Sequence, residues 1–217
     1  MVLAVSDFLS ALSDVDRDAL LALGTVRRYR GGVTLLHEHD EAGGVLVILE
    51  GQVSASVVGR GGTEVILGIA GPGELVGELA ALRGRARSAT VRARTDVVAL
   101  AVTGADFRRF LGTAPGAAVV VLDTVIERLE VADAQRRDLA ALDVVARVAA
   151  RLLELGERFG VSGEVVVTHE ELAAWAGASR ESVTKALAVL RSIGCVQTHR
   201  GSITVVDEAA LRRRAAV

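Results

Sequence analysis

The feature that most constrains this chain of 217 residues is a long segment with neither glycine nor proline. Residues 117–140 belong to this segment, and Pro115 stands just before it, where proline favours the start of a helix. We therefore predict one long helix with bounds 116–142. This helix separates two stretches of different texture, which predicts an N-terminal domain over 1–115 and a C-terminal domain over 143–217, each long enough to bury a core.

The N-terminal domain has the texture of short strands. Residues 7–23 place apolar side chains at helical spacing, which indicates one or two short helices. Between Val26 and Val102, short runs of Val, Leu and Ile alternate with glycines, a pattern typical of a compact antiparallel roll. A short helix should follow over 104–110. The expected strands are VLVILEG, VSASVVG, TEVILGIAG, SATVRA and DVVALAV.

The long helix carries an apolar seam, which we define as Leu122, Ile126 and Leu129. These residues recur at intervals of four and three, the spacing at which two helices pack against each other. The seam predicts that two copies of the chain pair through this helix, so we expect a homodimer.

The C-terminal domain follows the element order of a winged helix-turn-helix. We expect helices over 143–159, 169–176 and 180–192. A strand, VVVT, should lie between the first two helices, and a hairpin, CVQTHRGSITVV, should follow the last. The predicted fold class is therefore α+β: an antiparallel β-roll, a long dimerisation helix and a winged helix-turn-helix.

Capping residues mark the two central helices of the C-terminal domain. Thr168 and Glu171 have the spacing of a capping box. Gly177 suits the tight turn that follows, and Ser179 can cap the next helix. The exposed face of that next helix would carry the side chains that enter a DNA major groove, namely Arg180, Glu181 and Lys185.

The charge distribution permits DNA binding without requiring it. Residues 144–217 hold ten Arg or Lys and eight Asp or Glu. Lys185 is the only lysine of the chain, which reflects either a chemical requirement at that position or chance. Arginine can bond guanine O6 and N7 together, and glutamate can accept from cytosine N4. Arg200 and Ser202, at the expected hairpin tip, could contact phosphate, although exposed hairpin tips are polar in any case.

A second motif lies between the expected strands. Residues 71–80, GPGELVGELA, form a glycine-flanked turn that opens a short helix, and such a turn offers backbone N–H groups to a phosphate. Arg87 can neutralise the phosphate and Ser88 can donate its hydroxyl. Glu78 would suit a ribose hydroxyl, because a carboxylate beside an anion needs a donor from the same ligand. The alternative is a surface turn with a Glu78–Arg87 ion pair.

Together these segments resemble the CRP/FNR family of catabolite-activator-type regulators. GELVGELAALRGRARSATVRA is similar to the family's phosphate-binding cassette for cyclic nucleotides, LDVVARVAARLLEL to the helix that opens its DNA-binding domain, and GASRESVTKALAVL to its recognition helix. The three occur in the family's order, and the resemblance covers nearly the whole chain. It implies a bacterial transcription regulator and not an enzyme, in which cyclic AMP on the β-roll reorients the DNA-binding domains of a homodimer.

The resemblance also implies two sets of site residues and a further partner, RNA polymerase. The ribose and phosphate of the cyclic nucleotide would be held by Gly77, Glu78, Leu79, Ala80, Arg87 and Ser88. The bases of palindromic TGTGA-like sites would be read by Arg180, Glu181 and Lys185. Phosphates of the double-stranded DNA would be contacted by Thr168, Ser179, Ser182 and Arg200. His169 stands where the family has a basic residue.

The long helix departs from the family pattern where the base of the nucleotide would lie. Cyclic-AMP-binding members carry Thr then Ser there, and alignment through Leu142 places Ala132 and Asp133 at those positions. An ionised carboxylate only accepts hydrogen bonds, and guanine offers it two donors where adenine offers one. Arg136 or Arg137 can neutralise Asp133 instead. We expect cyclic AMP as the ligand, with cyclic GMP or ligand-independent DNA binding as the alternatives.

Other functions have less support. The His-Glu-His at residues 37–39 suggests a cupin-type metal enzyme, but the later histidine and glutamate of that pattern are missing, so we expect no metal. The single cysteine, Cys195, excludes a four-cysteine iron–sulfur site and should lie at the start of the wing. Acidic residues interrupt the N-terminal segment, unlike a signal peptide. No apolar run approaches the roughly 18 residues of a membrane span, so we expect a cytoplasmic protein.

Overall fold

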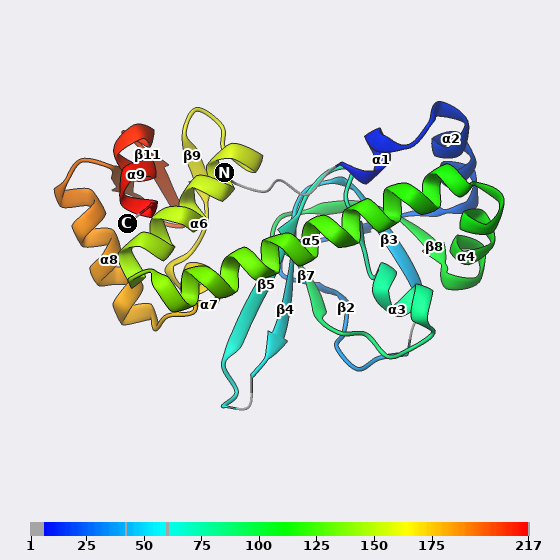
Figure 1. The fold of residues 1–217 in the computed structure, drawn as a ribbon, viewed down its shortest axis with the longest axis horizontal. Helices are drawn as coiled ribbons and strands as arrows, with labels where there is room; N and C mark the ends of the chain where they lie inside the picture. The colour runs from blue at the N-terminus through cyan, green and yellow to red at the C-terminus, as the bar shows by residue number, and fades with distance from the viewer. Residues whose placement is uncertain (1–6, 42, 60, 217) are drawn as a thin grey trace. The chain divides into compact units, whose positions relative to one another are not determined.

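A computed structural model describes residues 7–41, 43–59 and 61–216. The chain divides into two compact units, residues 5–129 and 130–217. The boundary falls inside one continuous helix, α5 (Pro115–Ala141), which Figure 1 draws as an unbroken ribbon. The observed helix begins and ends one residue earlier than the predicted span of 116–142.

The first unit contains two antiparallel four-stranded sheets, with orders β1-β8-β3-β6 and β2-β7-β4-β5. This confirms the predicted antiparallel roll, and the five predicted strands correspond to β3, β4, β5, β7 and β8. Strands β1, β2 and β6 were not predicted, because they are short and β1 is exposed along most of its length. The strands are β1 (Thr25–Tyr29), β2 (Thr34–Leu36), β3 (Gly44–Glu50), β4 (Val53–Val58), β5 (Glu64–Ala70), β6 (Leu75–Val76), β7 (Thr90–Ala93) and β8 (Val97–Thr103).

Strand β3 stands at the centre of the unit because both of its faces are buried. Val45 and Val47 point into a core shared with the helices. Leu46 and Ile48, which alternate with them, point into a second core between the sheets. Helices α2 and α4 lie side by side at the N-terminal end of α5 (Figure 1). The helices of this unit before α5 are α1 (Phe8–Ala11), α2 (Asp14–Leu23), α3 (Glu78–Arg83) and α4 (Gly104–Thr113).

The second unit contains the last turns of α5 and the predicted winged helix-turn-helix. Its three-stranded sheet has the order β10-β11-β9. Helices α7 and α8 have the predicted bounds, whereas α9 was not predicted. After α5 the elements are α6 (Val144–Phe159), β9 (Glu164–Val166), α7 (His169–Ala176), α8 (Arg180–Ser192), β10 (Val196–Thr198), β11 (Ser202–Val205) and α9 (Glu208–Ala215).

The surface of α5 carries the predicted apolar seam. Leu122 is 57% exposed, Ile126 45% and Leu129 58%, so the seam side chains are available to a partner. No single helix of the described residues is long and apolar enough to cross a membrane. The pair α4 and α5 meets the length and composition criteria together, but across a bend of 116°.

Candidate ligand and nucleic-acid sites

The ligand cassette, which we define as residues 71–88, contains β6, which pairs with β3, and turns sharply at Gly77. Gly77 has a φ of +83°, a conformation that favours glycine. A Cβ at this position would lie 2.7 Å from Arg87 Nη1, so a larger residue would displace Arg87. Gly77 also offers no side-chain cap to α3. The first amides of α3, from Glu78, Leu79 and Ala80, therefore suit an anion.

Arg87 is buried beneath this turn, with 6% of its surface exposed. Its Nη1 donates to the Gly77 carbonyl at 2.8 Å, and its Nη2 donates to the Gly44 carbonyl at 2.7 Å. Burial lowers the pKa of Arg87, and the carboxylates of Glu78 and Asp40 oppose that shift. An arginine remains charged in any protein setting. The cassette thus holds one fixed cation close to the first amides of α3.

The His-Glu-His segment at residues 37–39 forms a turn that positions Arg87. The His39 amide donates to the Arg87 carbonyl at 3.0 Å, and the Arg87 amide donates to the Asp40 carbonyl at 2.8 Å. Among the described residues, no group of three or more His, Cys, Asp or Glu is placed to hold a metal ion. The segment contributes backbone hydrogen bonds that hold the chain at Arg87.

Glu78 is the buried acid of the cassette, and only 2% of its surface is exposed. Its Oε1 lies 2.6 Å from Arg128 Nη1 on α5, and Arg128 also donates to the Leu75 carbonyl. The sequence also allowed an ion pair between Glu78 and Arg87. In the structure, Glu78 pairs with Arg128 instead. No local pattern indicates Arg128 as the partner, because fifty residues separate it from Glu78.

The second carboxylate oxygen of Glu78 is a candidate contact for a ligand. Glu78 Oε2 is buried and has no hydrogen-bond partner among the described residues, a costly condition for a charged group. A hydroxyl donor from a ligand would satisfy it, as the sequence predicted for a ribose. Ser88, at the end of the cassette, is exposed. An amide cradle, a fixed cation and an acceptor for a hydroxyl together fit a phosphorylated sugar.

The two residues predicted to contact the base of the cyclic nucleotide follow the boundary inside α5 and belong to the second unit. Ala132 and Asp133 are half-buried on α5. Asp133 Oδ1 accepts from Arg136 Nη1 at 2.8 Å, which is the neutralising pair that the sequence allowed. The carboxylate of Asp133 is therefore partly satisfied within its own helix.

The helix-turn-helix shows the predicted caps. Thr168 and Glu171 form a full capping box, in which each side chain accepts from the other residue's amide. Gly177 ends α7 with a φ of +61°. The Ser179 side chain accepts from the Ser182 amide at 3.1 Å and starts α8. These contacts span three residues each, so they fix α7 and α8 locally.

The exposed face of α8 carries the predicted base-reading residues, which we call the reading face: Arg180, Glu181 and Lys185. All three are exposed, and Lys185 Nζ lies 2.7 Å from Glu181 Oε1. The opposite face is buried through Val183, Leu187 and Leu190.

Three further residues frame the reading face. His169 Nδ1 lies 3.2 Å from Thr184 Oγ1, which connects the start of α7 to α8. Arg200 is exposed at the tip of the wing. Ser202 donates to Glu164 Oε1 at 2.6 Å, so its hydroxyl proton already has a partner. An exposed helix face with charged side chains, together with an exposed arginine on the wing, suits the major groove and flanking phosphates of DNA.

Cys195 lies where the sequence placed it, immediately before β10, the first strand of the wing. It is fully buried, and burial raises the pKa of its thiol. A raised pKa disfavours the thiolate, which is the reactive form of cysteine.

Comparisons with known proteins match both halves of the chain. Residues 26–114 match the cyclic nucleotide-binding domain, and residues 146–214 match the Crp-like helix-turn-helix domain. The chain is 32% identical over 190 residues to a CRP-like cAMP-activated global transcriptional regulator of Mycobacterium tuberculosis, covering 85% of each. It is 31% identical over 206 residues to the cyclic AMP receptor protein of Thermus thermophilus, covering 95% of each.

The fold has a matching solved structure. A CRP-family transcriptional regulator of Thermus thermophilus superposes with a TM-score of 0.76 at 28% identity. The match covers 88% of this chain and 97% of that one.

Proposed function

Because this chain belongs to the CRP/FNR family of transcription regulators, we propose that it binds cyclic AMP in the ligand cassette and thereby controls the binding of a homodimer to palindromic TGTGA-like DNA sites. The family consists of regulators rather than enzymes, and it couples a cyclic-nucleotide-binding domain to a DNA-binding domain. In this proposal the protein acts in the bacterial cytoplasm with RNA polymerase as its partner.

The observation that carries the ligand proposal is that Glu78 Oε2 has no partner among the residues that the structure describes. The ribose 2′-hydroxyl of a cyclic nucleotide would donate to it, while the amides of α3 and the guanidinium of Arg87 would hold the cyclic phosphate. Arg128, on α5, donates to the other oxygen of Glu78. A ligand bound to Glu78 would therefore be connected to α5 through this ion pair. The names of the relatives, cAMP-activated regulator and cyclic AMP receptor protein, support the same ligand.

The homodimer proposal rests on the exposed seam. Three large apolar side chains on one helix, each about half exposed, are costly to leave in water. A second α5 would cover them through the same residues, because a two-fold contact is self-complementary. The two-fold axis of such a dimer would relate its two reading faces. Each reading face would then contact one half-site of a palindromic DNA site.

Cyclic GMP is the second candidate, and Asp133 favours it. A carboxylate can accept from N1–H and the amine of guanine side by side, whereas adenine offers one amine. The pair between Asp133 and Arg136 favours cyclic AMP instead, because it neutralises the carboxylate. Position 132 is alanine and makes no hydrogen bond to either base.

Calorimetric titration of the purified chain with cyclic AMP and with cyclic GMP tests this proposal. We expect one site per chain and tighter binding of cyclic AMP. Tighter binding of cyclic GMP would assign the base choice to Asp133. Binding of neither nucleotide would refute the ligand proposal and leave a regulator that binds DNA without a cyclic nucleotide.

A further inference from the structure

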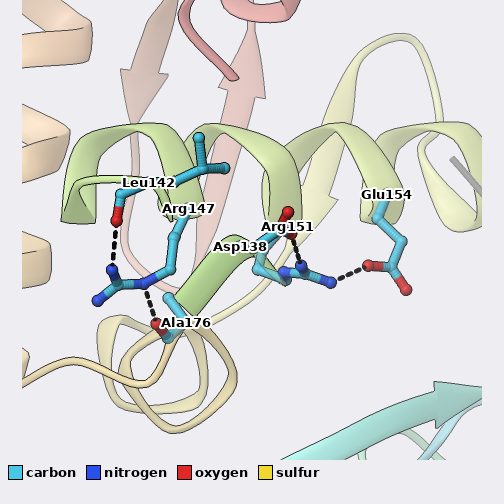
Figure 2. Close-up of polar contacts among 6 residues, drawn as sticks. All are labelled: Asp138, Leu142, Arg147, Arg151, Glu154 and Ala176. Carbon is cyan, nitrogen blue, oxygen red and sulfur yellow. Dashed lines mark hydrogen bonds and ion pairs between the residues drawn. The ribbon is translucent and has the colours of Figure 1, made fainter. Parts of the chain in front are cut away.

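Helix α6 carries a buried arginine, Arg151, that joins three elements of the second unit, and Figure 2 shows its two carboxylate partners. Arg151 donates to Asp138 on the last turns of α5 and to Glu154 on α6, each at 2.7 Å. Its guanidinium carbon also lies 5.6 Å from the ring centre of Trp175 on α7. One side chain therefore contacts α5, α6 and the first helix of the helix-turn-helix.

The burial of this group makes its contacts specific. Arg151 and Glu154 are each 7% exposed, whereas Asp138 is half-buried. A buried charge is tolerated when it is paired and hydrogen-bonded. The cation of Arg151 therefore favours the arrangement in which Asp138 is within reach, and disfavours arrangements in which α5 moves away.

A second arginine, one helical turn earlier, reinforces the same junction (Figure 2). Arg147 Nη1 donates to the Leu142 carbonyl, just after α5, at 2.7 Å. Its Nε donates to the Ala176 carbonyl, at the end of α7, at 2.8 Å. Both bonds go to backbone atoms, so they hold the path of the chain without depending on the identity of the neighbouring side chains.

We propose that Asp138, Arg151 and Glu154 form a clasp that fixes the orientation of the reading face relative to the last turns of α5, and so sets the half-site spacing that the dimer accepts. This inference rests on the proposed dimeric DNA-binding function. Two copies joined through α5 hold their reading faces at a fixed separation only if each face is fixed to its own α5. A fixed separation confers both affinity and a sharp spacing optimum on two-fold DNA.

Asp138 is the residue through which the clasp can be tested without unfolding the unit. The Arg151–Glu154 pair lies within α6, three residues apart, and remains when Asp138 is removed. Substituting Arg151 instead would leave Glu154 buried with only Arg158, 3.9 Å away, as a neighbouring cation among the described residues. Asp138→Ala therefore removes the ion pair between α5 and Arg151, while the buried pair of α6 and the backbone contacts of Arg147 stay in place.

The experiment measures affinity for a series of DNA duplexes in which the separation of two TGTGA half-sites changes one base pair at a time. Wild type should show a sharp optimum. Asp138→Ala should lose about tenfold in affinity at that optimum and less elsewhere, because the loss of preorganisation flattens the spacing profile. Asp138→Glu, which keeps the carboxylate, should restore the profile. Glu130→Ala, at an exposed acid of α5, is the matched control and should leave it unchanged.

Two readouts separate the clasp from a simple loss of stability or charge. The slope of affinity against salt should stay at the wild-type value, because the clasp contacts no phosphate. An Asp138→Ala protein that weakens every spacing equally, or that keeps the wild-type profile, would overturn the proposal.

The clasp can fail independently of the proposed function. If cyclic AMP has no effect on wild type, the ligand proposal fails, and the spacing series is run without nucleotide. If no DNA binding is found, the rate of hydrogen exchange at the amides of residues 139–142 tests whether the clasp holds the end of α5. Exchange should be faster in Asp138→Ala than in wild type and Glu130→Ala, and equal exchange would overturn the clasp.

Discussion

The ligand cassette and the helix-turn-helix both place a few polar side chains, but they do so through opposite kinds of contact. In the cassette, Glu78 meets Arg128 from fifty residues away, and Arg87 reaches the Gly44 carbonyl from 43 residues away. In the helix-turn-helix, the caps at Thr168 and Ser179 bond to amides three residues on. The geometry of the cassette therefore depends on the whole roll, whereas that of the reading face depends on a short stretch of chain.

The largest effect that follows from this contrast concerns Arg128. Arg128→Ala would leave the buried carboxylate of Glu78 without its cation, which should lower the free energy of unfolding of the first unit by about 3–5 kcal/mol. Urea unfolding followed by circular dichroism measures this. Arg136→Ala is the control, because its pair with Asp133 is exposed and should contribute less than about 1 kcal/mol. Equal effects of the two variants would mean that the buried pair is no more important than a surface pair.

Next in size is the loss of the cassette cation. Arg87→Ala should weaken cyclic AMP binding by about 2–4 kcal/mol, because a charge-assisted contact with phosphate is lost in a sheltered site. Calorimetry on the folded variant measures the loss. The variant should also melt at a lower temperature, since Arg87 bonds two carbonyls of the roll. Unchanged affinity in a folded variant would exclude this pocket as the ligand site.

The reading face should respond one side chain at a time, without a cost to folding. Arg180→Ala should reduce DNA affinity by about 1–3 kcal/mol and relax the preference at one base pair of each half-site. Arg200→Ala, on the wing, should weaken all sequences alike and reduce the salt slope by about one. Binding assays across single-base variants of the site separate the two. If Arg180→Ala weakens every sequence equally, Arg180 contacts phosphate and does not read a base.

The smallest expected effect is the loss of stability when the N-terminal cap of α6 is removed. Asp143 accepts from the Ala146 amide at the start of α6 and pairs with Arg214, 2.5 Å away. Asp143→Ala should cost about 1 kcal/mol of stability at neutral pH. Thermal melts at several pH values measure it.

The same variant carries a pH signature. The Ala146 amide, and after it Arg214, hold the pKa of Asp143 below its usual value. A carboxyl whose pKa is lowered by folding stabilises the folded state above its unfolded pKa, and this contribution is lost as the pH falls through the folded pKa. The difference between wild type and Asp143→Ala should therefore shrink below about pH 4. A difference that stays constant to lower pH would show that the carboxylate charge is not what stabilises the helix.

The same contrast explains how much could be predicted from the sequence. The bounds of α7 and α8, the capping box and the buried face through Val183 and Leu187 all follow from local patterns, and the structure shows them as predicted. The glycine turn of the cassette was also visible locally. The partner of Glu78 was not, since nothing near residue 78 points to Arg128.

Other features were missed for related reasons. Strand β1 is exposed on most of its residues and so lacks the alternation by which strands are recognised. Helix α9 has a single buried residue, Leu211, and three consecutive arginines, so its apolar periodicity is weak. The clasp was missed because Asp138 and Arg151 lie on different helices, thirteen residues apart.

The most direct test of the account is to measure DNA affinity with and without cyclic AMP on the same two-fold duplex, and cyclic AMP affinity with and without that duplex. Coupling between two sites is reciprocal. We expect saturating cyclic AMP to tighten DNA binding by about 5- to 150-fold, and DNA to tighten the binding of the dimer's two cyclic AMP molecules, taken together, by the same factor. A protein that binds both ligands while neither changes the affinity for the other would contradict the claim that the cassette controls the reading face.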